Sequence, residues 1–460
     1  MKNKLSTLFI SLLLTFLVIF CLSSCESSET ENPPSSTRSP TQSQTIDSQG
    51  QADIIDRGDG AGNTDVKDEN QAIDLMAGYT AGISSTRELD EAFISNGWRL
   101  ATQLFKSSNE SSPNGNVLIS PLSIQLALAM TANGAEGETK TQMETLLGNN
   151  FTIDELNAYL KTYVSNLPNE KGYKLNVANS IWFRNWGFAP NSDFLQANKN
   201  YYDASIYSAP FDNTTVNDIN NWVNTNTDGM IKKLLDQISN NSIMYLINAI
   251  AFDAEWDVKY SEDSIHNDLF TMENGETKET EFMQSTEYAY YELNNAVGFR
   301  KDYKNGQYSF VALLPNEEIS INDFVNSLSY EEIINMLNNP DYSKDVIAKM
   351  PKFSYEYSLE MNDVLSSLGM ERAFDQTGAE FGKIGQAGGN IFIGAVRHKT
   401  FISVDEAGTK AGAVTLVEVK EECAGERNEI EIVLDRPFVY MIIDNATGLP
   451  VFIGTLTSIK

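Results

Sequence analysis

The stretch VDEAGTKAGAVTLVEVKEE, residues 404–422, begins as a turn-prone acidic segment, continues with strand-like alternation and ends in charged residues. From Thr409 to Lys420, every second side chain is small or β-branched, and the charged side chains all occupy the positions between them. A period of two with one charge-free face is typical of a strand that buries one face. Taken alone, the stretch predicts a half-buried strand of a hairpin, and its loop-like ends need an explanation from the rest of the chain.

The composition of the chain argues against one class of partner. Of the 460 residues, 41% are hydrophobic, which is ample for a large packed core. The 33 Lys and Arg residues against 63 Asp and Glu residues give a net charge of -30. Such a surface repels phosphate backbones, so we expect no nucleic-acid binding, whereas cationic partners would be attracted.

The N-terminus has the pattern of a targeting segment. Lys2 and Lys4 precede the apolar run 5–22, which is followed by Ser-Ser-Cys25. A basic start, an apolar centre and small residues at the end predict a secretory signal peptide over residues 1–24. This ending resembles a bacterial lipoprotein lipobox, which implies cleavage before Cys25 and lipidation of its thiol. The alternative is a signal-anchor helix, because an apolar run of this length is just long enough to span a bilayer.

The same resemblance implies where the protein is located. A lipidated Cys25 would anchor the chain in the cell envelope, at the outer membrane or the cell surface. Of the three cysteines, Cys21 would leave with the signal peptide and Cys25 would carry lipid, so that Cys423 remains as the mature thiol. We therefore expect no internal disulfide.

The composition changes once along the remaining chain. Residues 25–87 are rich in Ser, Thr, Pro, Asn, Gln, Asp and Gly with few aromatic residues, which predicts a disordered tether. Periodic apolar patterns begin at residue 88 and continue to residue 460 without a second linker, which predicts one domain. Helical patterns dominate its first part and strand patterns follow without regular alternation, so an α+β fold is favoured over a doubly wound sheet.

Motifs for catalysis are absent from the sequence. The chain has two histidines, His266 and His398, and it contains no nucleophile elbow, zinc-protease helix, phosphate-binding loop or Cys-x-x-Cys pair. His266 lies in a polar stretch, whereas His398 follows an apolar strand and is interpreted as a hydrogen-bonded core residue. Asn248 sits inside the apolar run 242–252, where an unpaired amide would cost about 1–3 kcal/mol, so we expect polar partners for it. A surface glycan-active enzyme is the weakest hypothesis, because no pair of carboxylates is singled out.

Six segments together carry a resemblance to a known family. In chain order, the chain resembles the serpins in these stretches: NVLISPLSIQLALAMTANGAEGET (116–139), INNWVNTNTDGMI (219–231), LINAIAFDAEW (246–256), MPKFSYEYSLEMNDVLSSLGM (350–370), HKTFISVDEAGT (398–409) and RPFVYMIID with PVFIGTL (436–456). Each match alone is weak, but all six follow the family order across about 90–456.

The resemblance implies a fold and a mechanism. The serpin fold has three β-sheets, about nine helices and an exposed reactive loop, here about 406–430, near the C-terminus. A target protease attacks the loop and forms an acyl-enzyme, after which the cleaved loop inserts into the main sheet and distorts the protease. The positions that match the family hinge are Glu406, Gly408, Thr409, Ala411, Gly412, Ala413 and Thr415. In the family, Ser120, Ser123, Asn248 and His398 match a polar cluster behind the opening sheet, and Trp256 matches the aromatic residue at the top of the opening.

The usual loop length of the family implies a cleavage site. Seventeen residues from Glu406, the scissile bond would lie between Glu422 and Cys423, which would select a glutamyl- or aspartyl-preferring protease. A shifted register leaves alternatives open, with cleavage after Lys420 by trypsin-like enzymes, after Val417 or Val419 by elastase-like enzymes, or after Glu421.

The function expected from the resemblance is inhibition of a serine protease, with papain-like cysteine proteases as a second target class. The implied protein is a monomer without cofactor, metal or catalytic residues of its own. We expect no heparin binding, because residues 152–167 lack the Lys/Arg-rich helix of heparin-activated relatives. The alternative function is a non-inhibitory serpin that serves as a surface binding module.

Overall fold

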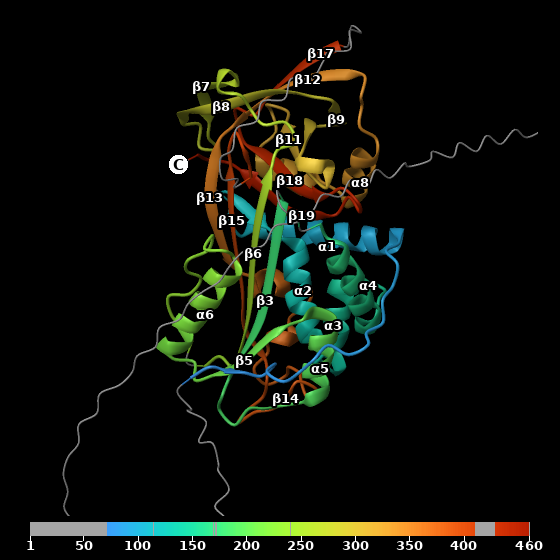
Figure 1. Ribbon diagram of the computed structural model, residues 1–460, viewed down its shortest axis with the longest axis vertical. Coiled ribbons are helices and arrows are strands. Elements are labelled where there is room, and N and C mark those ends of the chain that lie inside the picture. The colour runs from blue at the N-terminus through green and yellow to red at the C-terminus, as the bar shows by residue number, and fades with distance from the viewer. Residues whose placement is uncertain are drawn as a thin grey trace, which may run out of the picture. The chain divides into compact units, whose positions relative to one another are not determined.

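The computed structural model describes residues 71–459 except 114, 169, 171–172, 240 and 410–427. Its α+β fold, with several sheets and with helices outside any regular alternation, confirms the predicted fold class (Figure 1). The α-helices in this described part are α1 (Glu91–Glu110), α2 (Pro121–Ala132), α3 (Gly137–Gly148), α4 (Ile153–Asn166), α5 (Ser192–Tyr202), α6 (Asn213–Asn226), α7 (Ile321–Ser327), α8 (Tyr330–Asn338) and α9 (Asn362–Ser367).

The main sheet has seven strands, and it contains the longest strands of the molecule. Their spatial order is β1 (Ile73–Asp74), β5 (Ser205–Ala209), β3 (Tyr173–Arg184), β6 (Met244–Glu255), β16 (Gly408–Thr409), β15 (Ile393–Val404) and β13 (Phe353–Glu360). The first nine residues of β6 are all buried, as expected for a central strand with both faces covered.

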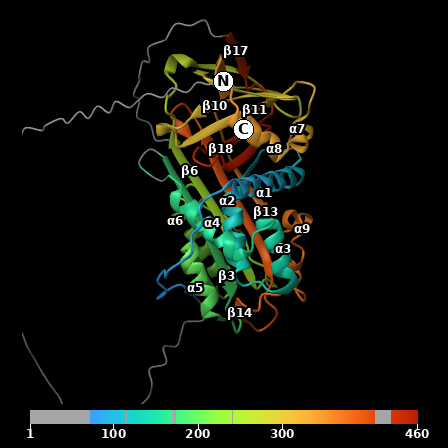
Figure 2. The same ribbon diagram turned by 90° about the vertical axis from the view of Figure 1, so that its right-hand side faces the viewer.

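Two apolar clusters cover the two faces of this sheet. Successive residues of β6, such as Leu246 and Ile247, belong to different clusters, because successive side chains of a strand point to opposite faces. The cluster with Ile247 is shared with α6, and the cluster with Leu246 is shared with α2. Figures 1 and 2 show α6 on one side of the sheet and α2 to α5 on the other. Any widening of the main sheet would therefore displace helices on both of its faces.

Helix α2 begins at residues that are typical of a helix start. The side chain of Ser120 accepts a hydrogen bond from the backbone N–H of Ser123 at 3.3 Å, and Pro121 occupies the first helical position. Every residue of α2 is buried, which is typical of a helix that is apolar on all sides and lies inside the core. This start of α2 places Ser120 and Ser123 directly behind the main sheet.

Two further sheets complete the architecture. The first consists of β2 (Val117–Ile119), β19 (Pro450–Leu456), β18 (Phe438–Asp444), β11 (Tyr308–Pro315), β10 (Ala296–Asp302) and β9 (Ala289–Leu293). The second consists of β17 (Asn428–Val433), β12 (Lys344–Pro351), β8 (Thr277–Glu287) and β7 (Ile265–Thr271), and β14 (Gly385–Gln386) pairs with β4 (Ala189–Pro190). Strands β16 and β17 therefore lie in different sheets, one on each side of the undescribed residues 410–427 along the chain.

Residues 71–87 fall in the segment that the composition assigned to a tether, yet they are packed against the body of the domain. Strand β1 pairs with β5, and Met76 is buried. Further along, Gly82 donates its N–H to Asn200 at 2.8 Å, and Arg87 forms an ion pair with Glu155 at 2.9 Å. We call residues 71–87 the strap. None of the helices that the structure describes is long and apolar enough to cross a membrane.

Candidate functional site

The candidate site is the seam between the two central strands of the main sheet. Strands β6 and β15 pair directly and in parallel from Met244 and Ile393 to Ile250 and Thr400. Beyond this point they separate, and β16 lies between them. Gly408 pairs with Glu255, and Thr409 pairs with both Ala254 of β6 and Val404 of β15. The sheet is therefore closed along its lower part and is already entered by the hinge at its top.

A chain of buried polar groups, which we call the shutter, crosses the closed part of the seam. His398 of β15 and Asn248 of β6 are register partners, and the imidazole Nδ1 is hydrogen-bonded to the amide Oδ1. On its other side, the His398 Nε2 accepts the backbone N–H of Ser120 at 3.2 Å. The Asn248 amide nitrogen donates to Ser123 Oγ and, at 2.7 Å, to Asn179 Oδ1 of β3. The shutter thus connects β15, β6, β3 and α2.

The protonation state of His398 follows from this geometry. Since Nε2 accepts a backbone N–H, the ring proton must be on Nδ1, where it is donated to Asn248. Complete burial disfavours the charged ring and lowers the pKa of His398 to about 3. His398 is therefore a neutral structural residue at physiological pH, and it has no ring nitrogen left for acid–base work or for a metal.

At the top of the seam, aromatic side chains hold the hinge. The rings of Trp256 and Tyr303 are stacked with centroids 4.4 Å apart. The indole Nε1 donates to the carbonyl of Asp405 at 2.8 Å, and the Tyr303 hydroxyl lies 2.5 Å from Thr409 Oγ1. The Thr409 side chain is thereby buried on the core face of the sheet.

Gly408 occupies a position that admits no side chain. A Cβ placed on Gly408 would lie 2.0 Å from the carbonyl oxygen of Ala254, well inside van der Waals contact. The glycine is therefore required by the close approach of the hinge backbone to β6.

A surface ion-pair network fixes Glu406, the first of the hinge positions. Lys352 lies 2.8 Å from Glu406 and 3.1 Å from Glu281, and the N–H of Tyr260 donates to the carbonyl of Glu406 at 3.1 Å. The hydrogen bond from Lys352 lowers the pKa of the Glu406 carboxyl. Lys352, which directly follows β12, thus connects Glu406 with Glu281 of the neighbouring strand β8.

Beneath Trp256 lies a second ion pair, which is buried. The Lys301 ammonium is 2.8 Å from Glu287, and it lies over the ring of Tyr260 at 4.5 Å from the centroid. The Lys301 side chain is only 3% exposed. Such a pair is costly to break, because removing one partner leaves an uncompensated buried charge.

The structure places the predicted site residues in two groups. Ser120, Ser123, Asn248 and His398 meet in the shutter, and Trp256, Glu406, Gly408 and Thr409 meet at the top of the seam. Cys25 lies outside the described residues, and so do the remaining hinge positions and every candidate for the cleaved bond. The hinge positions and bond candidates concerned are Ala411, Gly412, Ala413, Thr415, Val417, Val419, Lys420, Glu421, Glu422 and Cys423.

Several contributors to the site were not predicted from the sequence. Asn179, Tyr303 and Lys352 complete the shutter, the aromatic stack and the ion-pair network, respectively. One signal was available for Asn179, which interrupts a strand pattern in the same way as Asn248. No group of three or more His, Cys, Asp or Glu side chains in the described ranges is arranged to hold a metal ion.

Comparison with known proteins identifies the family. Residues 96–459 match the family described as Serpin (serine protease inhibitor). The chain belongs to the serpin family. This serpin is 30% identical over 356 residues to a serpin-like protein of Thermococcus kodakarensis, covering 75% of this chain and 82% of that protein. It is 29% identical over 377 residues to the leukocyte elastase inhibitor of Homo sapiens, covering 78% of this chain and 97% of that protein.

Two solved structures of the thermophilic serpin Tengpin are each 50% identical to this serpin. The native-state structure aligns with a TM-score of 0.81 over 85% of this chain and 100% of that chain. The latent-state structure aligns with a TM-score of 0.73 over 82% of this chain and 100% of that chain. This serpin thus aligns better with the native-state structure than with the latent-state structure.

Proposed function

We propose that this serpin inhibits serine proteases, with papain-like cysteine proteases as a second target class, by inserting its cleaved reactive loop between β6 and β15. One observation carries the proposal. The hinge strand β16 already lies between these strands at the top of the seam, while the shutter closes the rest. A sheet that is ready to accept a strand at one end and is held shut along the remainder fits a loop that inserts only after it is cut.

The register of β16 defines the path of the loop. If the chain continues antiparallel to β6 from Thr409, position 415 comes to lie opposite Asn248 and, on the other side, opposite His398. Both neighbouring strands give the same register, because Ala254 and Asn248 are as far apart in β6 as Val404 and His398 are in β15. In the inserted form, Thr415 would thus separate the two shutter residues, and its hydroxyl group could hydrogen-bond to them.

The burial of Thr409 defines the face of the loop. Its side chain points into the core toward Tyr303, and alternation would direct the side chains of Ala411, Ala413, Thr415, Val417 and Val419 to the same face. All of these are small or β-branched, whereas Lys410, Glu418 and Lys420 would stay on the other face. The loop sequence therefore fits a strand of this sheet and not only a bait for a protease.

The inserted length sets the displacement of the protease. In this register, position 419 reaches Met244 at the lower end of β6, so ten further residues would join the sheet. At about 3.3 Å for each residue, the acylated end would move roughly 33 Å. The hydrogen bonds and the apolar burial that form on insertion would drive the movement, and the uncut loop keeps the protein in a kinetically trapped form.

The target and the location of the inhibitor are further parts of the proposal. We retain the Glu422–Cys423 bond as the primary cleavage site, with Lys420, Glu421, Val419 and Val417 as alternatives, and a glutamyl-specific protease as the corresponding target. A lipidated Cys25 would display the inhibitor on the cell envelope, at the outer membrane or the cell surface. The acidic chain would favour basic proteases by electrostatic steering.

Incubation of the purified full-length chain with glutamyl-specific, trypsin-like, elastase-like and papain-like proteases tests the proposal. The expected product is an adduct that survives SDS, together with a C-terminal fragment whose mass identifies the cleaved bond. Thr409→Arg should abolish the adduct while cleavage continues, because insertion would bury a cation. Thr277→Arg on the exposed start of β8 serves as the control. Clean cleavage without any adduct would contradict inhibition and leave the alternative of a serpin used as a binding module.

A further inference from the structure

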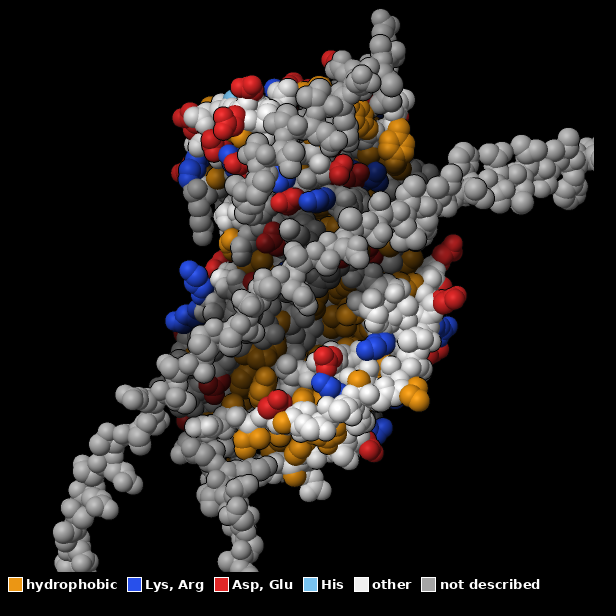
Figure 3. Space-filling view, in the orientation of Figure 1, with side chains coloured by type: hydrophobic (Ala, Val, Ile, Leu, Met, Phe, Trp, Pro, Cys, Tyr) orange, Lys and Arg blue, Asp and Glu red, His pale blue; other side chains and the backbone are white. Residues whose placement is uncertain are grey.

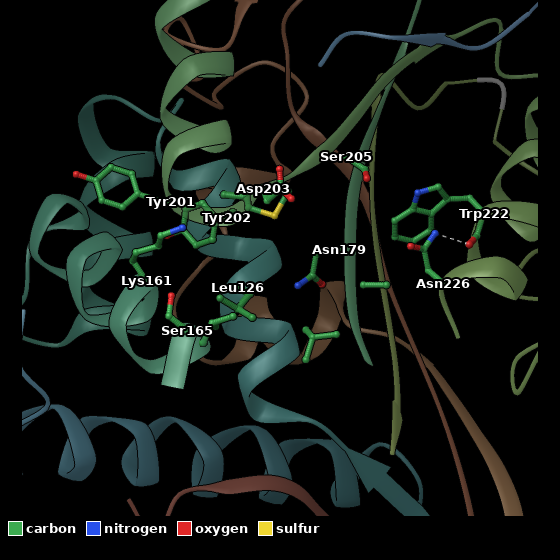
Figure 4. Close-up of a pocket in the computed structure, with 14 residues that line it drawn as sticks. Leu126, Lys161, Ser165, Asn179, Tyr201, Tyr202, Asp203, Ser205, Trp222 and Asn226 are labelled. Atoms are coloured by element: carbon green, nitrogen blue, oxygen red, sulfur yellow. Dashed lines mark hydrogen bonds between the residues drawn. The ribbon is translucent and has the colours of Figure 1, made fainter. Parts of the chain in front are cut away.

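A cavity of about 230 Å³ opens beside the shutter, between β3 and the helices α2, α4, α5 and α6 (Figure 4). Its floor is apolar and is formed by Leu126, Met130 and Val177, and Val164 at the rim is 39% exposed. Figure 3 shows hydrophobic side chains gathered in a hollow on this face of the molecule. An apolar floor that remains open in a folded domain is a feature of ligand sites.

Two hydrogen-bond donors face this floor without partners of their own. Lys161 of α4 lines the cavity and forms no ion pair or hydrogen bond within the described part of the chain. Asn179 accepts a hydrogen bond from Asn248 through its Oδ1, which leaves its amide nitrogen available to donate to another group. Figure 4 shows this nitrogen on the side of the cavity, and the described residues offer it no acceptor. A ligand here would have to supply acceptor atoms for an ammonium and an amide N–H₂ group.

We propose that this cavity binds a medium-chain carboxylate. The hydrocarbon chain would lie on Leu126, Met130 and Val177, and the carboxylate would accept hydrogen bonds from Lys161 and Asn179. The lining also contains Asp203, whose carboxylate is paired with Lys199. Lys161 is therefore the charged group of the lining that has no partner among the described residues, and charge complementarity favours an anion. A cavity of about 150 Å³ holds benzene, so one of about 230 Å³ has room for roughly nine heavy atoms, which is close to the size of octanoate.

The position of Asn179 connects this cavity with the shutter. One side of its amide accepts the hydrogen bond from Asn248 at 2.7 Å, and the other side faces the proposed ligand. A carboxylate bound there would restrain Asn179 and β3 next to the seam. Because a ligand that binds the closed form and not the unfolded chain stabilises the closed form, octanoate should raise the thermal unfolding midpoint.

Titration calorimetry and thermal unfolding of the full-length chain with octanoate, below its micellar concentration, test the proposal. Octanoate should bind at one site and raise the midpoint, whereas acetate lacks the chain, and octylamine carries the wrong charge, so neither should bind. Lys161→Met should raise the Kd for octanoate at least tenfold. Val164→Glu should abolish octanoate binding and allow octylamine to bind. Lys383→Met removes an exposed lysine away from the cavity and should change nothing.

Two results would overturn the assignment. Equal binding of octanoate, octanol and octylamine would indicate unspecific apolar adsorption, and unchanged octanoate affinity in Lys161→Met would place the ligand elsewhere. Neither readout depends on a protease, so failure of this proposal is distinguishable from failure of the inhibitory function.

Discussion

His398 and Asn248 face each other across the seam of the main sheet, and the hydrogen bond between Nδ1 and Oδ1 joins the two strands that a new strand would have to separate. The bond belongs to a chain in which each polar group has a partner, from the backbone N–H of Ser120 to Asn179 Oδ1. Closure of the sheet therefore depends on a hydrogen-bond network that single substitutions can interrupt.

Removal of the central amide should open the shutter. Asn248→Ala deprives His398, Ser123 and Asn179 of their common partner, and each buried polar group left unsatisfied costs about 1–3 kcal/mol. We expect a lower urea midpoint and faster conversion to an inactive, denaturant-resistant form without protease. Asn226→Ala is the matched control, since Asn226 is exposed and donates only to a helix carbonyl. Equal loss of stability in both variants would contradict the role of the shutter.

The buried imidazole should make the stability of the protein depend on pH. The pKa of His398 is about 3 in the folded protein and about 6.5 in an unfolded chain. Its contribution is fully present above pH 6.5, and it is lost as the pH falls toward 3, because the unfolded chain binds the proton first. The slope between these values is roughly 1.4 kcal/mol for each pH unit.

The difference between the protein and His398→Gln isolates this contribution from the titration of carboxylates. Denaturant unfolding at several values between pH 7 and pH 4 should show a gap in unfolding free energy that narrows with acid. A gap of constant size would show that His398 is not buried as a neutral group.

Gly408 should decide whether the loop can begin to insert. In Gly408→Val, the added side chain would collide with the carbonyl of Ala254, so the hinge should stay out of the seam. We expect cleavage by the target protease with little adduct, measured as a severalfold rise in the number of inhibitor molecules consumed for each trapped protease. Gly389→Val is the control, because no heavy atom lies within 4 Å of a Cβ at that position. Unchanged trapping by Gly408→Val would rule out insertion in this register.

The ion pair between Lys352 and Glu406 should act on the rate of spontaneous insertion more than on global stability. Both side chains are partly exposed, so the pair itself contributes at most about 1 kcal/mol. Lys352→Met should nevertheless speed the conversion to the inactive form, and added salt should remove the difference. Lys349→Met is the matched control, because Lys349 lies in β12, the strand directly before Lys352, and pairs with Glu431, away from the hinge. The same acceleration in both variants would argue against a role of this contact in holding the hinge.

Most of the predicted site residues came from the resemblance to the serpins, and only a few of them also have a local physical cause. Ser120 and Pro121 follow helix-start rules, and Asn248 had to find partners because an amide in an apolar strand is costly when it is unpaired. Tyr303 and Lys352 could not be found in this way, since they directly follow β10 and β12, reach the hinge from distant parts of the sequence and have no local pattern of their own.

The strap shows the opposite limitation. Its polar composition predicted a tether, but the backbone pairing of β1 with β5, the burial of Met76 and the contacts of Gly82 and Arg87 attach it to the domain. Composition averages over such a segment and therefore misses a few well-placed contacts. A pairing of only two residues has no periodicity to detect.

The strap also protects the protein from its neighbours. An edge strand presents unpaired N–H and C=O groups that invite pairing with another chain. Because β1 covers the edge of β5, that side of the sheet is less available as a template for aggregation. If the proposed insertion takes place, the same sheet accepts one strand at its centre, while β1 hinders the addition of another chain at its edge.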